Sequence, residues 1–220
     1  MTRRFRLPLL ALLAALVAGC AGTREAAEPG PTPLPATNYY EIATPLGALV
    51  IRLSDATPVH RDNFKKLVAE SFYDGTTFHR VIRGFMAQGG DPNTKDDDPI
   101  NDGQGGPGYT LPAEIVPGAT HTIGALAAAR QADQVNPERR SSGSQFYLVT
   151  GNASHLDGQY TIFGEVVQGL DVLARIELAE TARSTGRRGA AAFRDRPFDP
   201  IPMTVRPLPD YAELRSASGG

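Results

Sequence analysis

The run from Phe78 to Asp91, FHRVIRGFMAQGGD, combines residue types that could act on a bound group without covalent chemistry. Arg80 supplies a fixed positive charge, Phe85 and Met86 are apolar, and Gln88 offers an amide. The run contains no nucleophile beside a general base and no metal-ligand spacing. A site of these residues can hold an apolar group beside one cation, which predicts either a conformational reaction or a binding site.

Two further runs accompany this segment in the chain. One combines GALAAAR (residues 124–130) with GSQFYLVTG (residues 143–151), and the other is HLDGQYTIFGEV (residues 155–166). In their order and spacing the three runs resemble the cyclophilin family of peptidyl-prolyl isomerases, over about Tyr39 to Pro207. The resemblance implies a mainly β fold, a closed antiparallel β-barrel of about eight strands capped by two α-helices. It also implies isomerase activity on proline-containing polypeptides without a cofactor or a metal.

The resemblance gives individual positions an expected role. Arg80 stands where the family places its catalytic arginine. The residues expected to bind the substrate are Phe85, Met86, Gln88, Ala129, Arg130, Gln145, Tyr147, His155, Leu156 and Tyr160. Some of them depart from the usual pattern: Arg130 replaces a common asparagine, and His155 stands where a tryptophan or phenylalanine is usual. The change at His155 predicts weak binding of cyclosporin.

The physical chemistry of prolyl isomerisation agrees with this resemblance. Rotation about an X–Pro bond crosses a barrier of about 18–20 kcal/mol set by amide resonance, and the uncatalysed exchange takes tens to hundreds of seconds. At the twisted midpoint the nitrogen loses conjugation and gains a lone pair. A guanidinium near that nitrogen, or near the carbonyl oxygen, stabilises the twisted state over the planar one. Arginine suits this role because it stays charged and holds its donors in a rigid fork.

The elements that must position these residues can be read from periodicity. Alternating apolar residues on either side of Pro45-Leu46-Gly47 predict a β-hairpin from about Tyr39 to Leu53. Thr57-Pro58 reads as an N-cap and first position of a helix, and a second helix is expected over Leu170–Ile176. Short strand-like runs lie between the helices, at residues 77–82, 85–88, 123–129, 145–149 and 161–165. This pattern favours a closed or nearly closed barrel with helical caps, and residues 91–108 read as a solvated loop.

The N-terminus predicts export and lipid attachment. Three arginines precede twelve largely apolar residues, too few to span a bilayer. Val17-Ala18-Gly19-Cys20 then resembles a bacterial lipobox, with lipidation of Cys20, the only cysteine in the chain. Ala21 is not the aspartate associated with retention at the inner membrane, which favours the outer membrane in a cell with two. An ordinary secretory signal with a chance cysteine is the alternative.

These boundaries predict four segments. They are a signal peptide at 1–19, the lipidated cysteine with a proline-rich tether at 20–37, the isomerase domain at 38–208 and a tail at 209–220. Removal of the signal would leave 19 of the 22 basic residues against 24 acidic ones, a net charge of −5, which argues against a nucleic-acid partner. We expect a monomer tethered to a membrane in the periplasm. A non-catalytic module that binds proline peptides stays open as an alternative, whereas no triad supports a hydrolase.

Overall fold

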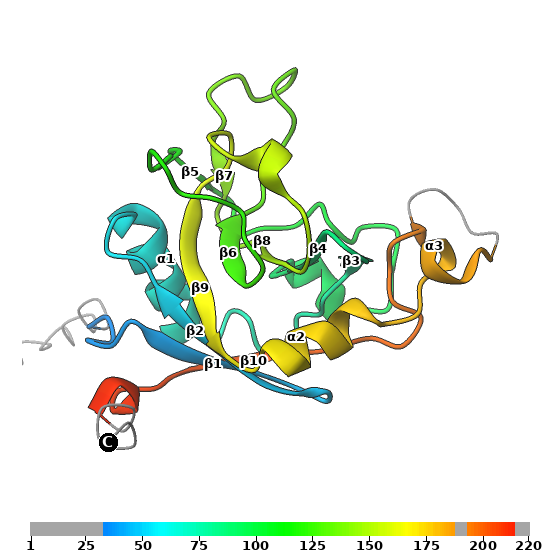
Figure 1. Cartoon of the computed structure of the whole chain (residues 1–220), viewed down its shortest axis with the longest axis horizontal. Helices are drawn as coiled ribbons and strands as arrows, with labels where there is room; N and C mark the ends of the chain where they lie inside the picture. Colours follow the sequence, from blue (N-terminus) through cyan, green and yellow to red (C-terminus); the bar gives the residue numbers. More distant parts are fainter. Residues whose placement is uncertain (1–32, 188–192, 214–220) are drawn as a thin grey trace, which may run out of the picture. The chain divides into compact units, whose positions relative to one another are not determined.

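The computed structural model describes residues 33–187 and 193–213, in which one curled antiparallel sheet dominates (Figure 1). Its eight strands follow the order β10-β1-β2-β9-β6-β8-β4-β3. Their bounds are β1 Tyr39–Thr44, β2 Gly47–Leu53, β3 Arg80–Ile82, β4 Met86–Gly89, β6 Ala125–Ala128, β8 Phe146–Val149, β9 Ile162–Gln168 and β10 Thr204–Pro207. A separate two-stranded pair joins β5 (Thr110–Leu111) to β7 (Ser141–Ser142). The predicted lipobox and most of the proposed tether lie outside the described residues.

The predicted hairpin is confirmed, with β1 and β2 paired from Tyr39↔Arg52 to Thr44↔Gly47. The two edge strands of the large sheet, β3 and β10, do not pair with each other along their length. Instead the residues just before each of them form a bridge, Thr77↔Pro202, with Phe78 N donating to Ile201 O at 3.0 Å. The mainly β, antiparallel prediction therefore holds, and the sheet closes through a short bridge rather than a ladder of strand hydrogen bonds.

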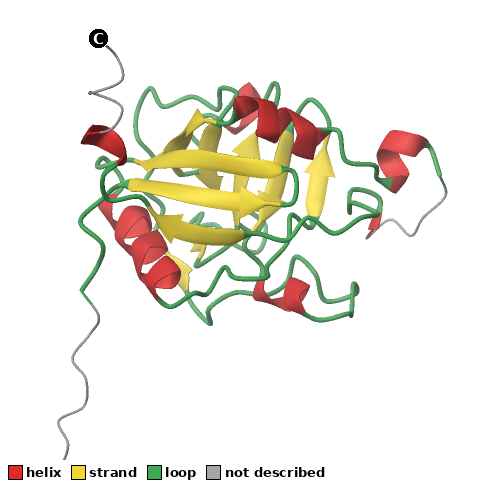
Figure 2. Ribbon diagram, turned by 90° about the horizontal axis from the view of Figure 1, so that it is seen from below, coloured by secondary structure: helices red, strands yellow, loops and turns green. Residues whose placement is uncertain are grey.

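Two α-helices cap the sheet as the sequence predicts. The first, α1 (Pro58–Ala69), packs against β9 and β10, and the second, α2 (Leu170–Glu177), packs against β2, β3 and β4. Figure 2 shows the strands lying between the two helices. The buried residues of each helix recur at three- and four-residue spacing, which places them on one face towards the core: Phe64, Leu67 and Val68 in α1, and Val172, Leu173 and Ile176 in α2. No helix in the described part of the chain is long and apolar enough to cross a bilayer.

The expected cap of α1 is replaced by a residue from another loop. Thr57 occupies the N-cap position, but its hydroxyl makes no capping hydrogen bond. Glu114 instead accepts from the backbone N–H groups of Val59 and His60 at 3.0 and 2.9 Å, and from His60 Nδ1 at 2.6 Å. A carboxylate is a stronger acceptor than a hydroxyl at the positive end of a helix, so this long-range contact prevails over the local one.

The remaining helical pieces are short. Two 3₁₀ helices, η1 (Pro92–Lys95) and η2 (Ser154–Leu156), interrupt the loops after β4 and β8, and α3 (Ala182–Thr185) follows α2. The loop expected to be solvated is anchored at its start, because Asp91 is fully buried and accepts from Asn93 N at 2.8 Å and Gly105 N at 3.2 Å. Two backbone N–H groups satisfy this buried carboxylate, and they fold the loop back beside the sheet.

Candidate active site

Strand register brings Arg80 and its expected partners into one row. Across the sheet, Arg80 lies opposite Gln88, Gln88 opposite Tyr147, and Tyr147 opposite Ala127. Directly opposed residues of antiparallel strands point to the same face. Side chains of β3, β4, β8 and β6 that are far apart in the sequence therefore share one surface of the sheet.

The two faces of these strands carry two different apolar clusters. Residues such as Ala87, Leu126, Phe146 and Leu148 belong to the main core under the helices. The alternate residues form a second, smaller cluster on the opposite face: Met86, Ala125, Ala127, Tyr147, Val149 and Ala153, with Phe85, Ala129, Leu156 and Tyr160 packed against them. The period of two along each strand thus supplies both the core and the floor of the site.

A cleft of about 490 Å³ lies over this second cluster. Its lining includes nine of the residues expected to act on the substrate: Arg80, Phe85, Met86, Gln88, Ala129, Arg130, Tyr147, Leu156 and Tyr160. Both Phe85 and Met86 reach it, although neighbours on a strand point to opposite faces, because Phe85 lies in the turn before β4 begins at Met86. The cleft therefore combines an apolar floor with the Arg80 guanidinium at its edge.

A chain of amides links the guanidinium to the backbone. Arg80 Nη1 donates to Gln88 Oε1 at 3.3 Å, Gln88 Nε2 donates to Gln145 Oε1 at 2.9 Å, and Gln145 Nε2 donates to the Gly105 carbonyl at 2.8 Å. Each amide accepts on one side and donates on the other, so a carbonyl that can only accept fixes the orientation of the whole series. Gln145 does not line the cleft itself and acts on it through Gln88.

The ring and the hydroxyl of Tyr147 have separate environments. The ring lines the cleft, whereas the hydroxyl meets His121 Nε2 at 3.0 Å. Asp157 Oδ1 accepts from His121 Nδ1 at 2.8 Å and from His121 N at 2.7 Å, which leaves Nε2 to accept from the tyrosine. Burial raises the pKa of Tyr147, and the hydrogen bond from His121 lowers the pKa of the Asp157 carboxyl. The Tyr147 hydroxyl is thus occupied by His121, and the apolar ring is the part of this side chain that contributes to the cleft.

Arg130 lines the cleft, whereas His155 does not. The Arg130 side chain is only 3% exposed, and its guanidinium lies 4.3 Å from the centre of the Tyr160 ring. It also donates to Gln159 O at 3.1 Å and pairs with Asp133 at 2.6 Å, so it fastens two loops beside the cleft. His155 lies outside the lining, with its ring 5.3 Å from that of Phe85. Its expected contact with substrate stays a prediction.

One wall of the cleft comes from residues for which no role in binding the substrate was predicted from the sequence. His79, Asp102, Gly103, Asp195 and Arg196 complete the lining. Burial lowers the pKa of His79 to about 4, which keeps its ring neutral, and burial raises the pKa of the Asp102 carboxyl beside Arg196 at 3.2 Å. Asp195 and Arg196 are separated from the Arg80 motif by more than a hundred residues, and no periodicity connects them.

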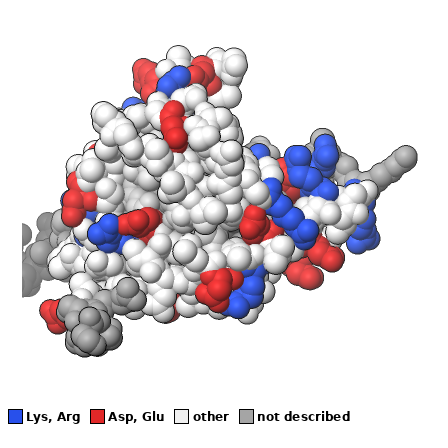
Figure 3. Space-filling model, in the orientation of Figure 1, with Lys and Arg blue, Asp and Glu red and all other residues white. Residues whose placement is uncertain are grey.

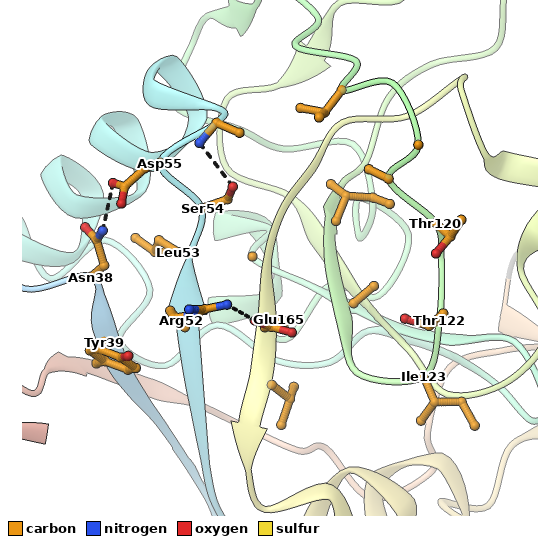
Figure 4. Close-up of a pocket in the computed structure, with 18 residues that line it drawn as sticks. Asn38, Tyr39, Arg52, Leu53, Ser54, Asp55, Thr120, Thr122, Ile123 and Glu165 are labelled. Carbon is orange, nitrogen blue, oxygen red and sulfur yellow. Dashed lines mark hydrogen bonds and ion pairs between the residues drawn. The ribbon is translucent and has the colours of Figure 1, made fainter. Parts of the chain in front are cut away.

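Two other hollows differ from this cleft. One of about 900 Å³ shares Gln88, Ala129 and Arg130 with it and extends the groove past Gln145 towards Val135. The other, of about 600 Å³, contains none of the expected site residues (Figure 4). Its polar side chains pair with one another, Arg52 with Glu165 and Asn38 with Asp55. Only the first of these two continues the surface on which Arg80 lies.

Comparison with known proteins agrees with the site's geometry. The family "Cyclophilin type peptidyl-prolyl cis-trans isomerase/CLD" matches residues 39–204. Peptidyl-prolyl cis-trans isomerase B of Bacillus subtilis is 43% identical over 118 residues, covering 53% of this chain and 73% of the relative. A peptidyl-prolyl cis-trans isomerase of Helicobacter pylori is 37% identical over 153 residues, covering 67% and 85% respectively.

Comparison with solved structures identifies the same family. The crystal structure of a cyclophilin type peptidyl-prolyl cis-trans isomerase from Cryptosporidium parvum matches with a TM-score of 0.64 at 27% identity, covering 78% of this chain and 99% of that one. A second structure of that protein, determined in the presence of the dipeptide Ala-Pro, matches with a TM-score of 0.63. The chain belongs to the cyclophilin-type peptidyl-prolyl cis-trans isomerases, a family of enzymes.

Proposed function

We propose that this chain accelerates rotation of X–Pro bonds in exported proteins, with Arg80 as the catalytic residue. The observation that carries the proposal is the position of the Arg80 guanidinium, at the edge of an apolar cleft and hydrogen-bonded to Gln88. The side chain is 45% exposed, so its remaining N–H groups are accessible to a bound peptide. Among the described residues, the lining of the cleft includes no serine, threonine or cysteine that would favour bond cleavage over rotation.

The mechanism follows from how the planar and twisted peptides differ. The proline ring packs on Phe85, Met86, Tyr147 and Leu156, which holds the ring still while the preceding carbonyl turns. The guanidinium of Arg80 then donates to the group that gains electron density at the midpoint. A charge-assisted hydrogen bond contributes about 1.5–3 kcal/mol, which corresponds to roughly one to two powers of ten in rate.

The rest of the acceleration comes from the surroundings of the cation. Gln88 is fixed by its hydrogen bond to Gln145, so it can hold the flanking peptide backbone without first reorganising. The apolar floor excludes water from the turning bond and strengthens the electrostatic effect of Arg80. Proline-containing polypeptides are therefore the substrate class we propose, as they are for the family.

An isomerisation assay tests this part of the proposal. The wild-type chain, Arg80→Ala and the control Arg52→Ala should be compared on a peptide containing Ala-Pro. Arg52 is an exposed arginine, paired with Glu165 at the remote hollow, so its variant should keep the wild-type rate. A wild-type chain that binds the peptide without accelerating exchange would instead identify a binding module.

We further propose that the enzyme works at a membrane of the cell envelope, periplasm-facing, held by lipid on Cys20. The support is the lipobox-like sequence and the proline-rich stretch after it. Two acyl chains give stable anchoring where one gives only marginal binding. The folded domain begins close behind that stretch, since the Thr37 hydroxyl donates to Leu208 O at 3.0 Å.

Fatty-acid labelling in a bacterial host tests the anchor. The wild-type chain should take up a labelled fatty acid and sediment with membranes, and outer-membrane fractions are the expected location. Cys20→Ser should abolish the labelling while leaving isomerase activity intact. Labelling that persists in Cys20→Ser would contradict the assignment.

A further inference from the structure

Residues 193–197, which come after α3 in the chain, form a wall beside the edge strand that carries Arg80. Val81 N, the backbone group next to Arg80, donates to Asp195 O at 2.7 Å. Arg183 N donates to Arg194 O at 2.7 Å, and Thr181 bridges to Pro197. Figure 1 shows this segment running alongside β3. Backbone hydrogen bonds therefore fix the position of Asp195 against the strand of the catalytic arginine.

The carboxylate of Asp195 lies between two guanidinium groups. Its Oδ2 is 3.7 Å from Arg80 Nε and 3.2 Å from Arg183 Nη2, and its Oδ1 accepts from Arg183 Nε. The Asp195 side chain is 15% exposed, against 45% for Arg80 and 47% for Arg183. A largely buried carboxylate held by one arginine thus faces the other from a fixed position.

This arrangement restrains Arg80 at two points. Its Nε side faces Asp195 and its Nη1 donates to Gln88, which lies across the strand pair. An arginine side chain loses rotamer entropy when it is held in one orientation. A restraint that is already present in the free protein removes part of that loss from the catalytic step.

The charge balance keeps the cleft positive. Asp195 is shared with Arg183, so the three side chains together carry a net charge of +1, and the carboxylate does not cancel the guanidinium that faces the substrate. Figure 3 shows several basic side chains, with acidic ones among them, over the part of the surface around α3. Arg187 is exposed there as well, and its charge adds to that of these three side chains.

We propose that Asp195 is a positioning residue that orients the Arg80 guanidinium for catalysis, with Arg183 holding Asp195 in place. The inference rests on the proposed catalytic role of Arg80 and adds a residue to that same site. Asp195 itself acts through Arg80 and needs no contact with the turning peptide bond.

A double-mutant cycle separates positioning from a general structural role. The variants are Asp195→Asn, Arg80→Ala and the pair together, measured as kcat/KM for isomerisation and as Kd for the peptide. We expect Asp195→Asn to lower kcat/KM about fivefold in the wild-type background. A change of this size corresponds to the free energy that an ion pair near the surface contributes. In the Arg80→Ala background, Asp195→Asn should leave kcat/KM unchanged, because the guanidinium that Asp195 orients is absent. The Kd of Asp195→Asn for the peptide should stay within twofold of the wild-type value.

A measurement on Arg80 itself makes the inference independent of activity. Nitrogen relaxation of the Arg80 Nε–H should show a lower order parameter in Asp195→Asn than in the wild-type chain. The control is Asp199→Asn, which removes an exposed aspartate of the same segment that lies outside the cleft lining. The control should leave both the rate and the order parameter unchanged.

Three results would overturn the inference. They are an equal loss of kcat/KM in both backgrounds, an unchanged or raised kcat/KM in a folded Asp195→Asn, and an unchanged Arg80 order parameter. A wild-type chain without isomerase activity would refute the proposed function, whereas the relaxation comparison would still decide whether Asp195 orients Arg80.

Discussion

The amide chain behind Arg80 gives a sharp prediction at Gln145. This side chain is only 7% exposed and makes two hydrogen bonds, one to the Gly105 carbonyl and one from Gln88 Nε2. Gln145→Leu is close in size and removes both bonds while keeping the site filled. Gln88 would then be oriented only by its longer contact of 3.3 Å with Arg80.

The magnitude follows from the two lost bonds. Each neutral hydrogen bond contributes about 0.5–1.5 kcal/mol net, and the two groups left behind lie in a partly buried site. We expect the free energy of unfolding to fall by about 1–3 kcal/mol. We also expect kcat/KM to fall about tenfold, equivalent to about 1.4 kcal/mol of transition-state stabilisation.

The assay compares isomerisation of an Ala-Pro peptide with urea unfolding for the same proteins. The matched control is Gln168→Leu, an exposed glutamine of β9 whose partner is the Tyr211 hydroxyl at 3.0 Å, away from the cleft. The control should retain the wild-type kcat/KM. If Gln145→Leu is less stable but keeps the wild-type kcat/KM, the amide chain does not orient the catalytic arginine and this reasoning fails.

Three further predictions concern buried or partly buried polar groups. Tyr147→Phe should lower the free energy of unfolding by about 1–3 kcal/mol, because it leaves the buried His121 Nε2 without its partner, and should keep kcat/KM within twofold, because the ring still lines the cleft. His79 has a folded pKa of about 4, below its unfolded value near 6.5, so the unfolded chain binds the extra proton. The free energy of unfolding of the wild type should therefore fall relative to that of His79→Gln as pH falls from about 6.5 to about 4, by up to about 1.4 kcal/mol per pH unit. Urea unfolding measures this, and an equal pH dependence of the unfolding free energy in the two proteins would contradict the prediction. Glu114→Gln should lower the unfolding free energy by about 1–3 kcal/mol, because the first turn of α1 loses a charged acceptor; an unchanged urea midpoint would contradict that role.

The sequence predicted the part of the site that is local in the chain. Arg80 and Gln88 lie on paired strands of one short hairpin, so a single run contains both the cation and the amide beside it. Every residue of β6 and β8 is buried, and the period of two explains why alternate residues belong to the main core and to the floor of the cleft. These features depend on neighbours a few residues away, which is why reading along the chain finds them.

The remaining features depend on contacts between distant segments. Asp195 meets Arg80 only because the chain after α3 returns to the edge strand β3. Glu114 replaces the expected cap at Thr57 for a similar reason, since no pattern within residues 57–69 reveals a carboxylate arriving from another loop. The strand β10 went unnoticed because prolines break the pattern of residues 200–207.

The long loop after β4 shows the same limit. Its run of aspartates and glycines reads as solvated, and much of it is exposed, yet Asp91 is buried at its start and Asp102 reaches the cleft. Buried carboxylates are uncommon without partners. Here backbone N–H groups and Arg196 provide them, and composition alone does not show such partners.

The most direct test of the account is the rate of X–Pro isomerisation by Arg80→Ala, measured together with the affinity of the same protein for the peptide. The account predicts a loss in kcat/KM of about ten- to a hundredfold, with peptide binding within a few-fold of wild type because the apolar floor remains. Equal isomerisation rates for Arg80→Ala and wild type would contradict the claim that a cation at the edge of this cleft stabilises the twisted peptide bond.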